Sequence, residues 1–193
     1  MLKKQMEQYI ANNARANKIE LFDFEKDYVE KHQLLPKGVT AAEKTFYANV
    51  LERCDKETEE LKGTEARGFL TEAVSYLKKH HNQFVYTESN IFEVIRVDAV
   101  ALEFDEVFET YTALFGLKLQ KKFGADIKAY LDNHLQGDGA KYSVMFSGED
   151  GLWDVNFALD YIESFSETQS FEEIYMTIYR FVFNMLETIE TTQ

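Results

Sequence analysis

The sequence predicts an α+β fold that is mostly α, with about six helices and a β-hairpin or small antiparallel sheet at residues 142–158 before the C-terminal helices. Apolar residues recur every three to four positions along most of the chain, which is typical of amphipathic helices. At Tyr142 this period changes to two, which is typical of strands with one buried face. The 193 residues fit a single domain, in which residues 1–36 are a candidate N-terminal helical arm.

Two capping boxes mark expected helix starts. In Thr40-Ala41-Ala42-Glu43 and again in Ser170-Phe171-Glu172-Glu173, a hydroxyl and a carboxylate can satisfy the free backbone amides of a first turn. We expect the first helix to run to Gly63 and a second to cover 64–81, which together would form an antiparallel helical hairpin. The Ser170 box should lead a C-terminal helix.

Other helices are expected over residues 1–17, over a short stretch near 21–32, and over 119–135. Residues 84–104 are ambiguous between helix and strand. Phe84 to Thr87 resembles a short strand, whereas polar residues at helical spacing favour a helix from about Asn90 into Tyr111.

The hairpin is the clearest β signal. Gly148-Glu149-Asp150-Gly151 supplies turn residues between an aromatic, β-branched strand and a strand in which Trp153, Val155 and Phe157 alternate with polar positions. These three side chains should face helices, whereas Glu149 and Asp150 should lie in solvent. An isolated hairpin is only marginally stable, so we expect it to pack on helices or pair with a third strand, for which residues 84–88 are the nearest candidate.

Composition indicates an intracellular, cytoplasmic protein. The chain is 45% hydrophobic and 28% charged, has the lone cysteine Cys54, and has no stretch approaching the roughly 20 apolar residues of a membrane helix. The net charge is −13, and the segment from Gly148 onward contains ten acidic residues and one basic residue, Arg180. This charge disfavours non-specific nucleic-acid binding and could attract a basic protein partner.

No spacing typical of a catalytic, metal or cofactor site occurs. His80 and His81 are adjacent rather than one turn apart, and a site assembled from His32, His80 and His134 would depend entirely on the fold. Cys54 falls on an apolar stripe, where a thiol usually packs as a small hydrophobe. We therefore expect no catalytic residue, metal or cofactor, with a metal-dependent hydrolase as the least favoured alternative.

The aromatic content suggests one candidate ligand pocket. Trp153 and Phe157 share the apolar face of the hairpin, and a gap beneath it would suit a small hydrophobic ligand. Phenol groups could line its rim: Tyr86, Tyr142, Tyr161, Tyr175 and Tyr179.

The favoured functional hypothesis is a non-enzymatic interaction or regulatory module that self-associates. The C-terminal helix is apolar nearly all round at residues 178–183, which is typical of central burial or of an interface. Tyr179, Val182 and Phe183 are the candidate homodimer residues. A sensor that binds a hydrophobic ligand near the hairpin is the alternative.

Overall fold

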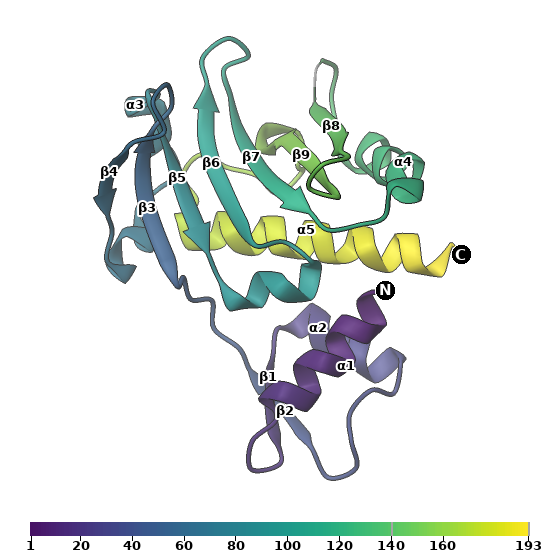
Figure 1. The fold of residues 1–193 in the computed structure, drawn as a ribbon. Helices are drawn as coiled ribbons and strands as arrows, with labels where there is room; N and C mark the ends of the chain where they lie inside the picture. Colours follow the sequence, from purple (N-terminus) through teal and green to yellow (C-terminus); the bar gives the residue numbers. More distant parts are fainter. Residues whose placement is uncertain (140, 193) are drawn as a thin grey trace.

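The computed structural model describes residues 1–139 and 141–192, and it is built around a seven-stranded antiparallel sheet crossed by a long helix (Figure 1). The α-helices are α1 (Leu2–Asn13), α2 (Asp23–Lys31), α3 (Tyr76–Lys79), α4 (Gly124–His134) and α5 (Phe171–Thr191). The strands are β1 (Lys18–Leu21), β2 (Thr40–Glu43), β3 (Val50–Asp55), β4 (Leu61–Thr64), β5 (Gln83–Glu88), β6 (Ala99–Asp105), β7 (Thr110–Leu117), β8 (Tyr142–Ser147) and β9 (Leu152–Ala158). Short 3-10 helices are η1 (Arg67–Thr71), η2 (Asn90–Ile95), η3 (Lys121–Phe123) and η4 (Leu159–Tyr161).

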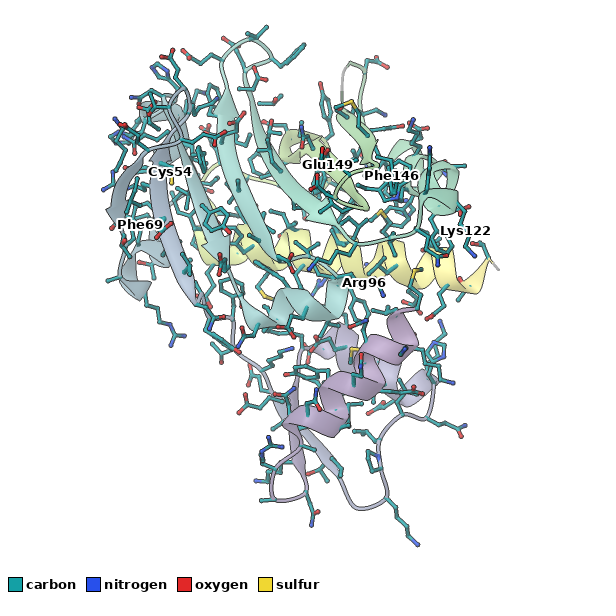
Figure 2. All side chains as sticks on the ribbon, viewed as in Figure 1. Cys54, Phe69, Arg96, Lys122, Phe146 and Glu149 are labelled. Atoms are coloured by element: carbon teal, nitrogen blue, oxygen red, sulfur yellow. The ribbon has the colours of Figure 1, made fainter. Side chains whose placement is uncertain are left out.

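The large sheet has the strand order β4-β3-β5-β6-β7-β9-β8. Each neighbouring pair in it is antiparallel. A separate two-stranded parallel sheet, β1 with β2, lies beside α1 and α2, and we call these four elements with Lys44 the N-terminal unit. Figure 2 shows Cys54 on β3 and Phe146 on β8, toward opposite edges of the large sheet.

Helix α5 covers one face of the large sheet. It begins as expected with the Ser170 capping box, in which the Ser170 hydroxyl accepts from the Glu173 amide and the Glu173 carboxylate accepts from the Ser170 amide. The Tyr175 hydroxyl donates to the Val85 carbonyl oxygen of β5 at 3.3 Å. Because α5 is buried along most of its length, it forms the centre of the hydrophobic core.

The predicted hairpin is confirmed as β8 and β9. Trp153, Val155 and Phe157 are buried on its inner face, and Glu149 and Asp150 are exposed at the turn. The third strand that stabilises it is β7, which pairs with β9. Residues 84–88 do form a strand, β5, but it pairs with β3 and β6 instead.

The prediction of a mostly α fold is wrong. Residues 40–64 form strands β2, β3 and β4 in place of a helix, and residues 64–81 hold only the short η1 and α3. Over a short window, the spacing of apolar residues in this region fits both a helix and a strand. Pairing with the distant strand β5 determines that β3 is a strand. The Thr40 hydroxyl consequently donates to the Asn17 carbonyl oxygen and caps no helix.

The second error concerns the helix expected from Asn90 into Tyr111. Only η2 is helical there, and it ends at Arg96 in the left-handed conformation, with φ of 63°. Strands β6 and β7 follow, with alternating buried and partly exposed residues. The alternation is masked in the sequence because outward positions such as Ala99, Ala101 and Leu114 are themselves apolar.

A buried ion pair within the N-terminal unit is hydrogen-bonded to α5. Lys44, which follows β2, contacts both carboxylate oxygens of Glu25 on α2, at 3.0 and 3.2 Å. The Tyr179 hydroxyl of α5 donates to the same carboxylate.

The two helices predicted in the N-terminal part are α1, which ends at Asn13 rather than Asn17, and α2. In the part of the chain described, no helix has the length and apolar character needed to cross a bilayer.

Candidate interaction surface

One face of the large sheet is covered by helices and the opposite face is open. Side chains on a strand alternate between the two faces, and β6 and β7 alternate strictly between buried and partly exposed residues. The buried set, which includes Leu102, Ala113 and Phe157 in register, faces α5. The opposite set, with Tyr86, Ala101, Leu114 and Asn156 in one row across β5, β6, β7 and β9, forms what we call the open face.

Four acidic side chains lie on the open face. Glu52 on β3, Glu88 on β5, Glu103 on β6 and Asp154 on β9 all belong to it by register. Of these, Glu103 is paired with Lys56 at 3.4 Å. Among residues 1–139 and 141–192, the other three carboxylates make no ion pair within 4.0 Å.

The open face also contains a hollow of about 340 Å³. Small residues line it where β6 and β7 run side by side: Ala99, Ala101 and Gly116. Larger residues stand around them, with Tyr86 on the β5 side and Leu152 and Asp154 on the β9 side. The hollow therefore combines a shallow apolar floor with negative charge at its rim.

Tyr86 is held in place at this rim. Its hydroxyl donates to Glu88 Oε1 at 2.7 Å, and Glu52 lies directly opposite it on β3. Partial burial raises the pKa of Tyr86 to about 12, with further contributions from the hydrogen bond to Glu88 and from the charges of Glu88, Glu52 and Asp98. Asp98 is also paired with Lys118 at 2.5 Å, so it is the least available of these three carboxylates.

The residues predicted to line a ligand pocket do not gather around one cavity. Trp153 packs edge-on against Phe146 and so close to Gly124 that a Cβ at Gly124 would overlap the indole. Phe157 contacts Phe181 of α5, with ring centroids 5.1 Å apart.

The predicted rim tyrosines are similarly dispersed. Tyr142 donates a hydrogen bond to Asp132 of α4, and Tyr161 packs against Gly137 and Gly139. Tyr175 stacks on Phe46, and Tyr179 bonds to Glu25. Tyr86 is the predicted rim residue that the open face uses.

The candidate homodimer residues are already covered by their own chain. Tyr179 and Val182 have no exposed surface and Phe183 has 1% exposed. Tyr28 and Phe24 of α2 pack on the Phe183 ring at 5.4 and 5.2 Å between centroids. These three residues are therefore buried within their own chain, whereas Arg180 is exposed and Phe181 is partly exposed.

The histidines have separate local partners. His80 stacks on Tyr76 and His134 on Tyr130, whereas the His32 ring packs at a tilt against Tyr28. Within the described ranges, no three histidine, cysteine, aspartate or glutamate side chains are grouped to hold a metal ion. Cys54 is 7% exposed on β3, and burial and the Glu52 charge raise the pKa of its thiol, which disfavours the reactive thiolate.

Comparison with family models, with curated proteins and with solved structures found no match to this chain. The geometry of the open face is therefore the basis for a functional hypothesis. The sequence pattern predicts a binding role for Tyr86 but for none of Glu52, Glu88, Ala101 and Gly116. Ala101 could have been found from the alternation in Ala99-Val100-Ala101-Leu102, in which the small residues form the outward face of the strand.

Proposed function

We propose that this protein is a non-enzymatic interaction module whose open sheet face binds a basic protein partner. The observation that carries the proposal is the combination of an uncovered antiparallel sheet face with Glu52, Glu88 and Asp154, none of which has an ion-pair partner among the described residues. A stable antiparallel sheet can expose one face to water, but it then usually carries mixed polar side chains. Here three carboxylates without an ion-pair partner lie on the same face as an apolar hollow, and Asp154 lines that hollow.

Charge complementarity favours a basic partner over a second copy of the chain. The chain carries a net charge of −13, so two open faces would repel each other. A basic protein would instead be steered toward the face and would gain apolar contact over Ala99, Ala101 and Leu114. Interfaces commonly combine an apolar centre with a polar rim in this way.

The test uses fluorescently labelled basic peptides that contain interspersed leucine and tyrosine, with binding followed by anisotropy. One variant neutralises the face with Glu52→Gln, Glu88→Gln and Asp154→Asn. The matched control removes the same charge from exposed residues elsewhere with Glu7→Gln, Glu57→Gln and Glu163→Gln. We expect the face variant to weaken binding about tenfold or more and the control by about twofold or less.

Two further observations distinguish a binding surface from diffuse attraction. Amide chemical shifts should change on β5, β6, β7 and β9 when peptide is added, and binding should weaken with added salt because the charges are exposed. Equal losses in the face and control variants would contradict the proposal, as would shift changes confined to the helical side of the molecule.

A further inference from the structure

The hollow on the open face, at about 340 Å³, is large enough to hold one long side chain. Its floor is made of Ala99 and Ala101 on β6 and Gly116 on β7. A Cβ at Gly116 would already lie 3.3 Å from a methyl carbon of Leu152, so the glycine and the leucine together set the depth of the hollow at that side. A hydrocarbon stem lying on this floor would bury apolar surface on both partners.

The aromatic ring of Tyr86 lies beside this floor, and carboxylates lie near it on both β3 and β5. Tyr86 lies opposite Ala101 on β6 and opposite Glu52 on β3. Glu88 follows two residues later on the same face of β5 and accepts a hydrogen bond from the Tyr86 hydroxyl at 2.7 Å. The hydrogen bond restrains the ring and leaves the other oxygen of Glu88 available to a cation.

We propose that this hollow binds an arginine side chain of the basic partner, with its stem on Ala99 and Ala101, its guanidinium stacked on the Tyr86 ring, and its N–H groups donating to Glu52 or Glu88. The inference rests on the function proposed above. A guanidinium is planar and weakly hydrated, stacks on aromatic rings and donates to carboxylates through two parallel hydrogen bonds. A lysine ammonium is a compact and strongly hydrated charge, so it gains less from the ring.

The test compares three peptides of one sequence, in which the basic positions are all arginine, all lysine or all citrulline. Citrulline keeps the shape of arginine but has no charge. We expect the arginine peptide to bind the wild-type protein about tenfold more tightly than the lysine peptide, and the citrulline peptide to bind more weakly still. Anisotropy gives the affinities.

Two variants locate the preference. Tyr86→Leu should remove most of the advantage of the arginine peptide while leaving binding of the lysine peptide within about twofold. Ala101→Leu should weaken the arginine peptide because the added side chain fills the floor of the hollow. Tyr47→Leu is the matched control, since Tyr47 is also partly exposed, at 41%, but lies before β3 beside the N-terminal unit.

A variant that keeps the ring checks the role of stacking independently of folding. Tyr86→Phe loses the hydrogen bond to Glu88 but should retain the preference for arginine, and Trp153 fluorescence together with thermal melting confirms that each variant is folded. Equal binding of the arginine and lysine peptides, with both still weakened by neutralising the face, would overturn the arginine site and leave the interaction surface intact. Binding insensitive to the face variant would overturn both proposals.

Discussion

Lys44 and Glu25 form an ion pair at 3.0 Å in which the two side chains are 3% and 0% exposed. The Lys44 ammonium also lies 4.2 Å from the centre of the Tyr9 ring and 4.8 Å from that of Phe22. The pair joins the segment after β2 to α2, and through Tyr179 to α5. Each charge is desolvated, so each depends on the other for compensation.

Removing one partner of this pair should therefore be strongly destabilising. We expect Lys44→Met to lower the free energy of unfolding by about 3–5 kcal/mol, because the Glu25 carboxylate is left buried without a counter-charge. Urea denaturation followed by circular dichroism measures the change. The double variant Lys44→Met with Glu25→Gln should recover part of the loss, and a double variant less stable than the single one would contradict this account.

Gly124 should be intolerant of any side chain. A Cβ there would overlap the Trp153 indole, and both residues belong to the closely packed contact between α4 and the sheet. Gly124→Ala should cost about 1–3 kcal/mol through forced repacking. Thermal melting gives the stability, and a shift in Trp153 emission would report the displaced indole. Gly148→Ala is the control, since nothing lies within 4 Å of its Cβ position.

The start of α5 should be sensitive to Ser170 and to acid. Hydrogen bonds from the Ser170 amide and hydroxyl lower the pKa of Glu173, so this group contributes stability above its unfolded pKa and loses it as the pH falls through the folded value. We expect Ser170→Ala to cost about 1 kcal/mol near neutral pH. In urea titrations, the difference between wild type and Glu173→Gln should shrink toward acidic pH; a difference that grows there would contradict the capping role.

Alkaline stability should reflect the tyrosines. The pKa values of Tyr86, Tyr130 and Tyr142 are raised to about 12, chiefly by burial, from an ordinary value of 10.0. A raised pKa favours the neutral phenol in the folded state, so this stability is complete below pH 10 and is lost as the pH rises toward 12. Absorbance titration at alkaline pH should show late tyrosine ionisation in the folded protein and earlier ionisation in urea. Tyr86→Phe should remove part of the late step.

Capping boxes, turn residues and side-chain periodicity predicted the elements that depend mainly on residues close together in the sequence. The Ser170 capping box predicted the start of α5, and the hairpin turn and the alternation around Trp153 predicted β8 and β9. The Thr40 capping box failed because the same four residues pair with β1, a contact that depends on residues more than twenty positions away.

The open face could not have been predicted as a surface. Glu52, Tyr86, Ala101 and Leu114 lie far apart in the sequence and become neighbours only through the pairing of β3, β5, β6 and β7. The candidate dimer residues show that sequence also cannot tell which surface will cover an apolar patch. An apolar patch on a helix has the same sequence pattern whether its own chain or a partner covers it, and here α2 covers Phe183.

For this protein, the sequence by itself determined the acidic character, the hairpin at residues 142–158 and the long capped helix that follows it. These depend on composition, on turn residues and on the periodicity of neighbouring side chains. The tertiary structure decided that the hairpin is one end of a seven-stranded sheet, that α5 covers one face of this sheet, and that the other face remains open. Strand pairing joins residues distant in the sequence through backbone hydrogen bonds, which side-chain periodicity does not specify.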